Sequence, residues 1–315
     1  MKNNSFLICA SEEKYFLSEG EADKCCSNSW SHFDRETRNL DAIVELGAEP
    51  NDAASLLEET TRPHVHRTNN NGIILFLRAI NLNPNSEPED MVSLRFWCNG
   101  ERLITVMNRK VQAVAMVKEK ILSNSNRTLK IPDIFVEIIH QTMLRIETHV
   151  TKLSEKIEFL EEQIDKNQPV QQSDVMDLKR STSRLWRFMY PQLDSLKKLS
   201  ATDLAWMSDN LKYSLKEFVD LMSYYNEELI LIKERCEILS NEITSNINDK
   251  VNRNLYIISI ISVIFLPLGF ITGLLGINVG GIPAASSEDG FLYVMIIMGV
   301  IFIGQLLLLK IFKWF

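Results

Sequence analysis

Small and hydroxyl-bearing side chains recur every seven residues near the C-terminal end of the chain. One series comprises Asn252, Ser259, Leu266 and Gly273, and the second comprises Leu255, Ser262, Gly269 and Gly276, with Ile258 at its edge. A spacing of seven keeps each series on one side of a helix. Such a stripe either lets membrane helices pack closely or lines a wet passage between several helices. The second use requires an oligomer, because two helices enclose no channel.

Two long apolar runs must position this stripe. Residues 255–275 contain no charge, and residues 291–309 contain only Gln305 as a strongly polar side chain. Each run matches the roughly 20 residues that cross a bilayer core as a helix. The alternative is a pair of buried core helices, but no flanking sequence is available to cover them on all sides. The sequence therefore predicts two membrane spans.

The basic residues around these spans predict the topology. Lys250 and Arg253 precede the first span and Lys310 and Lys313 follow the second, whereas residues 276–290 contain no Lys or Arg. By the positive-inside bias, both termini are expected in the cytoplasm. The first residues have neither a long apolar core nor a small-residue cleavage site, so no signal peptide is expected.

The cysteines agree with a reducing compartment. All five lie before the first span and none is spaced as CxxC; they are Cys9, Cys25, Cys26, Cys98 and Cys236. Structural disulfides and a cysteine-based zinc cluster are therefore not expected.

The region before the stalk is predicted to be an α/β domain, residues 1–130. The chain has 315 residues, 45% of them hydrophobic, and the acidic excess behind its formal net charge of −7 lies before residue 251. Strands are predicted at residues 72–80, 91–97 and 102–107, with an Asn99-Gly100 hairpin, and helices at residues 52–59 and 112–121. The negative charge argues against nucleic acid as a partner.

From residue 131 to residue 250 the pattern changes to long helices. Apolar residues there follow one another at steps of three and four, as in Ile146, Val150, Leu153, Ile157, Leu160 and Ile164, and again in Phe218, Met222, Tyr225, Leu229, Ile232, Cys236, Leu239 and Ile243. This is a heptad seam. A helix is expected over residues 174–199, and Thr202-Asp203 is expected to cap the next one. Because no Pro or Gly follows before Pro267, that helix is predicted to run for roughly 100 Å as a stalk into the first span.

The end of the first span resembles a family signature. Residues 267–278 read PLGFITGLLGIN, which is similar to the segment of the CorA metal-ion transporters that ends in Gly-Met-Asn. The motif in this chain is Gly276-Ile277-Asn278, and the VGGIP that follows is similar to the ZntB branch of that family. Residues 77–84 and 87–95 also resemble the ZntB cytoplasmic domain, so the resemblance extends over nearly the whole chain.

The resemblance implies a funnel-shaped homopentamer in the bacterial inner (plasma) membrane. Residues 251–278 are then the pore helix, residues 279–290 an external loop, residues 291–309 an outer helix and residues 310–315 a basic cytoplasmic tail. The resemblance also implies uptake of zinc, with cadmium or nickel as related cargo, coupled to a proton gradient. The divalent cation is the substrate, and no cofactor is expected.

The polar residues of the spans favour an ion that keeps its water shell. Neither His nor Cys lies in the spans or the loop, and the only carboxylates are those of Glu288 and Asp289. Because stripping a small divalent ion needs such ligands, the expected filter is a ring of Asn278 with carbonyls near Gly276 and Ile277. The alternative for Asn278 is a helix cap. The two loop acids either attract cations or form a solvated turn.

Apolar residues on the stripe are expected to gate the passage. Leu255 and Leu266, with Ile258 beside them, are expected to form a constriction that closes by dewetting, and Asn252 is placed at the cytoplasmic mouth. Neither span contains Asp, Glu or His, so proton coupling rests on the resemblance alone.

One pair of histidines has a spacing that suits a metal ion, and a second pair does not. His64 and His66 flank Val65, and on a strand they point to one face as candidate transition-metal ligands; the alternative is a polar sheet edge. His140 and His149 lie nine residues apart on opposite faces of a helix and need no metal.

Other functions remain open to the sequence. One is a magnesium or cobalt channel of the same family, since the expected filter contacts water rather than metal. Another is a membrane-tethered coiled-coil signalling or scaffold protein that conducts no ions. Enzyme activity is not expected, because the chain has no phosphate-binding loop, no nucleophile motif and no carboxylate pair at a diagnostic spacing.

Overall fold

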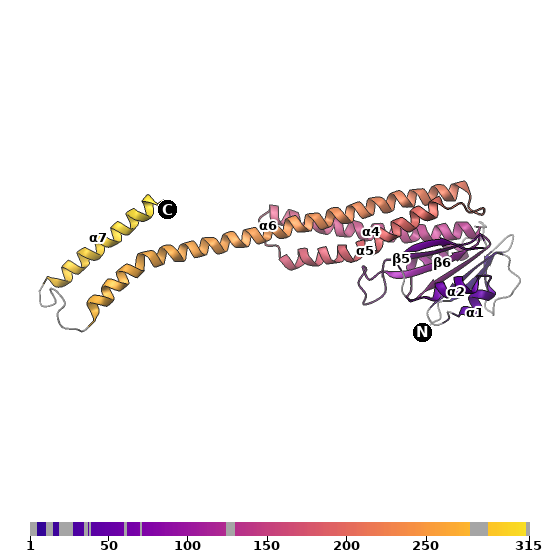
Figure 1. Cartoon of the computed structure of the whole chain (residues 1–315), viewed down its shortest axis with the longest axis horizontal. Helices are drawn as coiled ribbons and strands as arrows, with labels where there is room; N and C mark the ends of the chain where they lie inside the picture. Colours follow the sequence, from indigo (N-terminus) through magenta and orange to yellow (C-terminus); the bar gives the residue numbers. More distant parts are fainter. Residues whose placement is uncertain are drawn as a thin grey trace. The chain divides into compact units, whose positions relative to one another are not determined.

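A computed structural model describes residues 5–10, 15–18, 28–34, 37, 39–59, 62–69, 71–123, 130–277 and 289–312. The chain divides into two compact units, Met1–Ser240 and Asn241–Phe315. The first unit contains a β-sheet and a set of long helices, and the second contains two apolar helical segments (Figure 1).

Seven strands form one sheet in the first unit. The strands are β1 (Phe6–Ala10), β2 (Tyr15–Ser18), β3 (Asn28–Phe33), β4 (His64–Arg67), β5 (Ile73–Ala79), β6 (Val92–Cys98) and β7 (Arg102–Met107). Their order across the sheet is β2-β1-β3-β7-β6-β5-β4, and each described pair is antiparallel except β3 with β7. The strands predicted from the three apolar runs are confirmed as β5, β6 and β7, and the Asn99-Gly100 turn joins the last two.

Helices cover both faces of this sheet. The helices of the first unit are α1 (Leu40–Glu45), α2 (Pro50–Leu57), α3 (Gln112–Ser123), α4 (Ile131–Asp165) and α5 (Gln172–Ala201), with the first part of α6 (Asp209–Gly276). Trp97 packs in a buried cluster with residues of α1 and α2, whereas its neighbour Phe96 meets Phe135 of α4 edge to face at 5.4 Å. Successive residues of a strand point to opposite faces of the sheet. Because helices cover both faces, β6 is buried along its whole length.

Three helices of the same chain fill the predicted heptad seam. Figure 1 shows α4, α5 and the first part of α6 running side by side in the first unit. All eight predicted seam residues of α6 are buried, as are those of α4 except Ile164, which is half-buried. Arg235 of α6 binds both carboxylate oxygens of Glu161 of α4, and Lys179 of α5 lies 2.7 Å from Glu237 of α6. The seam is therefore satisfied within one chain.

The predicted start of the long helix was wrong. Thr202 ends α5 as its C-cap, and α6 begins at Asp209 rather than at Thr202-Asp203. In the connection Leu204 and Met207 are buried, and the Trp206 indole N–H donates to the Asn71 carbonyl at 2.9 Å. The absence of Pro and Gly permits a helix in this connection. Burial of its apolar side chains outweighs that helix propensity, so the helix begins later. From Asp209 the helix runs for 68 residues, roughly 100 Å, with Pro267 inside it.

The turn between β6 and β7 provides a test of this packing. Gly100 has a φ of +95°, and a Cβ added there would collide with the side chain of Trp206. Gly47 has a φ of +99°, but its added Cβ meets only the guanidinium end of Arg102, at 3.3 Å. We expect Gly100→Ala to lower the free energy of unfolding by about 1 kcal/mol more than Gly47→Ala. Both alanines are strained by the left-handed backbone, but only the one at position 100 also collides with Trp206. Thermal unfolding of the two purified variants measures this difference, and equal losses would contradict the packing described.

Candidate ion-conducting segment

The second unit holds two helices that are long and apolar enough to span a membrane. They are the C-terminal part of α6 and α7 (Gly290–Ile311). None of the most apolar stretch of α6, and only 6% of that of α7, is buried within the chain. The described part of the chain therefore does not bury these helices as a core, and their length and composition make both of them candidate membrane spans.

The two spans each have a less exposed side. In the span part of α6 the half-buried residues are Ile260, Ile264, Pro267, Leu268 and Ile271. Along one side of α7 the half-buried or buried residues include Val294, Met298, Ile301, Gln305 and Leu309. A hydrogen bond links the helices, because the Gln305 amide donates to the Val263 carbonyl at 3.3 Å. We take these sides as the ones that the two spans turn toward each other.

This hydrogen bond has a cause in the sequence of α6. Pro267 has no backbone N–H, so the carbonyl four residues earlier, that of Val263, lacks its partner in the helix. A carbonyl without a partner is costly in a membrane. Gln305, the strongly polar residue of the second span, supplies the missing donor. The sequence contained both signals, a proline in one span and an amide in the other, but did not indicate that they meet.

The candidate pore stripe lies on the opposite side of α6. At about 100° per residue, the stripe residues centre about 180° away from the half-buried side. On the single chain Leu255 is 56% exposed, Ile258 60% and Leu266 73%. A Cβ added at Gly269, Gly273 or Gly276 would meet nothing within 4 Å. The described part of this chain therefore leaves the stripe uncovered.

The hydroxyl groups of the stripe are oriented as acceptors. Ser259 donates to the Leu255 carbonyl and Ser262 to the Ile258 carbonyl, both at 2.9 Å. With its proton used within the helix, each oxygen presents lone pairs outward. The waters around a cation point their hydrogens away from it, so these oxygens suit a hydrated cation better than an anion.

The predicted filter falls at the edge of the described residues. Gly276 ends α6, where free carbonyls and the negative end of the helix dipole favour a cation, and Ile277 follows it exposed. Asn278 and Glu288 lie outside the described residues. Asp289 is exposed and precedes α7 as its N-cap. Asn252, at the other end of the stripe, is exposed on α6.

The histidine pair lies on β4, an outer strand of the described sheet. The rings of His64 and His66 are nearly parallel, with centroids 5.9 Å apart, and His64 Nδ1 lies 2.8 Å from the Arg62 carbonyl. Burial lowers the pKa of His66, and the neighbouring His64 lowers it further. Among the described residues no group of three His, Cys, Asp or Glu side chains is arranged to hold a metal. The pair lies at an edge of the described sheet, and its role as a metal-ligand pair stays a prediction.

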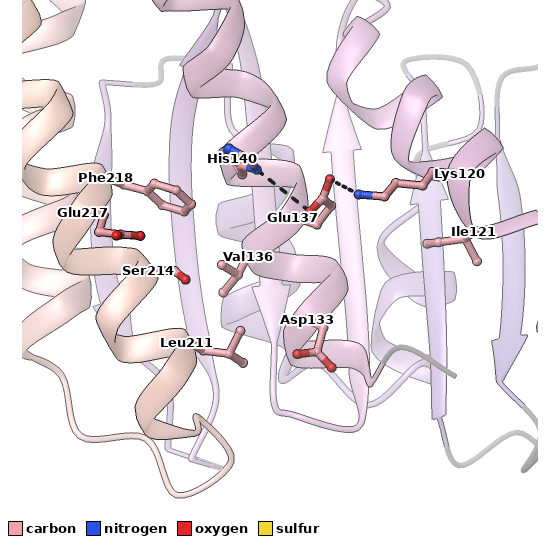
Figure 2. A pocket seen from close by; sticks show the side chains of 10 residues that line it. All are labelled: Lys120, Ile121, Asp133, Val136, Glu137, His140, Leu211, Ser214, Glu217 and Phe218. Carbon is pink, nitrogen blue, oxygen red and sulfur yellow. Dashed lines mark hydrogen bonds and ion pairs between the residues drawn. The ribbon is translucent and has the colours of Figure 1, made fainter. Parts of the chain in front are cut away.

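A cavity of about 360 Å³ in the first unit is lined by residues of α3, α4 and α6, and acidic side chains from α4 and α6 gather in it (Figure 2). Figure 2 shows Glu137 between a lysine and a histidine: Lys120 Nζ lies 2.8 Å from one oxygen and His140 Nδ1 lies 4.0 Å from the other. The His140 ring also stacks on Phe218, with centroids 5.5 Å apart. The described side chains of this cavity form no group of three or more His, Cys, Asp or Glu that could hold a metal ion.

Together these elements define a membrane protein with two spans that follow a large α/β domain and a helical stalk. Comparison with known proteins specifies the class. The family model described as CorA-like Mg2+ transporter protein matches residues 27–313. The chain belongs to this family, as the Gly276-Ile277-Asn278 motif predicted.

Individual relatives agree with this assignment. The divalent cation transporter CmaX of Pseudomonas aeruginosa is 32% identical over 289 residues, which cover 90% of this chain and 87% of CmaX. The zinc transport protein ZntB of Pectobacterium carotovorum is 30% identical over 260 residues, which cover 82% of this chain and 79% of that protein. The structure of full-length CmaX aligns with a TM-score of 0.84 at 28% identity, covering 100% of this chain and 99% of that one. These homologues are transporters of divalent cations and not enzymes.

The link between Pro267 and Gln305 gives a prediction for the spans. We expect Gln305→Leu to destabilise the protein by about 1 kcal/mol, because the Val263 carbonyl loses its donor. In a Pro267→Ala background, which restores the N–H of residue 267, the same substitution should cost close to nothing. Unfolding in detergent of the two single variants and the double variant measures the coupling.

Ile303→Leu, at an exposed position of α7, is the matched control and should leave stability unchanged. If Gln305→Leu costs the same with and without Pro267, the proposed origin of the hydrogen bond is wrong.

Proposed function

We propose that several copies of this chain assemble as a homopentamer in the bacterial inner membrane and take up zinc through a pore lined by the α6 stripe. Both termini lie in the cytoplasm in this proposal. The observation that carries it is the uncovered stripe of serine and glycine on the side of α6 opposite the half-buried one. Two spans from one chain enclose no channel, so the stripe needs neighbouring copies to become a pore wall.

The stalk part of α6 supports an assembly of copies. Tyr224, Leu231 and Ile238 are exposed and lie seven residues apart, outside the seam that α4 and α5 fill. They occupy the same heptad position in the sequence as Ser259, Leu266 and Gly273. Apolar residues left exposed at regular helical spacing are typical of a surface that meets another protein.

The pore chemistry in this proposal selects a hydrated ion. The spans and their loop contain no imidazole or thiolate to replace the water shell of zinc. The hydroxyl oxygens of Ser259 and Ser262 accept hydrogen bonds from the waters of the ion, and a ring of Asn278 with the carbonyls of Gly276 and Ile277 forms the filter. Glu288 and Asp289 raise the cation concentration at the outer mouth.

The gate in this proposal is apolar. Rings of Leu255 and Leu266, with Ile258 at the edge, narrow the passage until water leaves it, which stops an ion that keeps its shell. Asn252 at the cytoplasmic mouth offers an amide to the ion as it leaves the gate.

Zinc as the cargo rests on the ZntB relatives and on the Gly-Ile-Asn motif. A magnesium or cobalt channel is the second candidate, favoured by the description of the family and by a filter that contacts water. Cadmium and nickel fit the same filter as zinc. Proton coupling would have to run through pore water, the loop acids or the first unit, because neither span carries Asp, Glu or His.

A transport assay with the full-length protein tests the proposal. Proteoliposomes containing a zinc-sensitive dye are compared with and without a pH gradient, and with excess magnesium outside. We expect zinc entry that the inward proton gradient accelerates and that magnesium inhibits weakly. Asn278→Ala should lower zinc flux at least tenfold, because every copy in the ring loses its amide hydrogen bond to the hydrated ion.

Asn254→Ala is the matched control, because Asn254 is an exposed amide of α6 that lies off the stripe. It should conduct as the wild type does. Zinc flux that is absent from all proteins would overturn the proposal, and equal competition by magnesium would favour the second candidate.

A further inference from the structure

Four arginines surround one cavity in the first unit, although the chain as a whole is acidic. The cavity has a volume of about 530 Å³, and its walls include Arg78 of β5, Arg109 after β7, and Arg184 and Arg187 of α5. We call it the arginine cavity. The four positions are distant in sequence and are brought together by the packing of α5 beside the sheet, where α5 contacts β5.

Arg78 is the most firmly held of the four. Its Nη1 donates to the Met91 carbonyl at 3.0 Å, and its guanidinium lies 4.8 Å from the centroid of the Phe188 ring. Arg187 contacts the same ring, also at 4.8 Å. Burial lowers the pKa of Arg78, and the neighbouring charge of Arg187 lowers it further. Two like charges on one aromatic ring repel each other, and an anion between them would remove this cost.

Three of the four arginines have no acidic side chain of the described cavity as an ion-pair partner. Glu89 is turned to His149, whose Nε2 lies 3.5 Å away. Hydrogen bonding with His149, aided by Ser181, lowers the pKa of Glu89 to about 2 despite its burial. Glu59 and Asp90 also line the cavity. Within the described ranges, however, no carboxylate oxygen lies within 4.0 Å of a side-chain nitrogen of Arg109, Arg184 or Arg187.

We propose that the arginine cavity binds a phosphate-type oxyanion, held by Arg78 and Arg109 on the sheet side and by Arg184 and Arg187 on α5. Guanidinium groups present paired donors that match the oxygens of a phosphate bidentately, and they remain charged at any physiological pH. Phe188 is already contacted by two guanidinium groups, so the site recognises phosphate groups rather than an aromatic base. The ligand is free pyrophosphate or the phosphate tail of a nucleotide.

Binding of this kind has a mechanical consequence. An oxyanion that contacts arginines on both sides ties α5 to β5 and to the end of β7. It therefore stabilises the first unit in proportion to its concentration relative to the dissociation constant. This role is independent of the proposed metal cargo, because none of the four arginines belongs to a span.

Thermal unfolding and calorimetry of the full-length protein in detergent test the proposal. Sodium pyrophosphate, ATP without divalent metal, inorganic phosphate and chloride are compared at equal ionic strength. We expect pyrophosphate and ATP to raise the unfolding temperature at millimolar concentration and chloride to have little effect. Equal affinity for pyrophosphate and ATP assigns recognition to the phosphate groups, and at least tenfold tighter ATP binding assigns the ligand to nucleotides.

Variants of single arginines distinguish binding at this cavity from a general effect of positive charge. Arg184→Gln and Arg187→Gln should each weaken pyrophosphate binding at least tenfold, and Arg184→Lys should weaken it less. Both arginines are exposed and each substitution removes a like charge, so the unliganded variants should unfold at no lower a temperature than the wild type. Arg180→Gln is the matched control on α5, because Arg180 lies outside the cavity and pairs with Asp177 at 3.2 Å.

Three results would overturn the proposal. They are the absence of stabilisation by any phosphate compound, chloride acting as strongly as pyrophosphate, and loss of binding in Arg180→Gln equal to that in Arg184→Gln. Because none of these readouts involves ion flux, failure of this site and failure of the proposed zinc transport are distinguishable.

Discussion

A polar group inside a bilayer has no water to bond, so each hydroxyl and carbonyl of a span needs a partner within the protein. This constraint explains the details of both spans. Ser259 and Ser262 direct their protons to carbonyls of their own helix, and Gln305 supplies the donor that Pro267 removes from the Val263 carbonyl. The oxygens of Ser259 and Ser262 keep acceptor lone pairs on the stripe side of α6. That side is the one suited to water and to a cation surrounded by it.

The helical stalk follows a second constraint, the burial of apolar side chains at heptad spacing. The apolar seam residues predicted from sequence are buried within one chain, since α4 and α5 cover them along α6. A coiled coil between copies is therefore not what the seam encodes. The exposed residues Tyr224, Leu231 and Ile238 form a second, separate series at heptad spacing that the described part of this chain does not cover.

Local patterns predicted much of this fold. The Asn99-Gly100 turn and the apolar runs around it predicted β5, β6 and β7, and the absence of charge predicted the spans. β3 was not predicted, because Asn28–Phe33 is largely polar and its stability depends on distant partners. The Trp30 indole donates to Thr105 Oγ1 at 2.9 Å, and His32, whose burial lowers its pKa to about 3, lies 2.7 Å from the same oxygen. No local pattern indicates a hydrogen bond across 75 residues of sequence.

The candidate sites were predictable to different degrees for the same reason. The stripe of α6 is periodic along one helix, so its residues could be named from spacing alone. The bond from Gln305 to Val263 and the cavity around Arg78 and Arg184 each need two elements that only the folded chain brings together. The predicted start of α6 was wrong because residues between α5 and α6 are buried by tertiary contacts, which helix propensity does not take into account.

The central claim is that the serine and glycine side of α6 faces water between copies of the chain. The most direct measurement is the labelling of single cysteines by a charged, membrane-impermeant thiol reagent, in full-length protein in proteoliposomes with the five native cysteines replaced. Ser259→Cys and Ile257→Cys lie at nearly the same depth but about 160° apart around the helix. The account predicts that the cysteine at position 259 reacts, because water ionises its thiol, and that labelling blocks ion flux, while the cysteine at position 257, on the side of α6 turned toward α7 and lipid, stays unreactive. Reaction at position 257 and none at position 259 would contradict it.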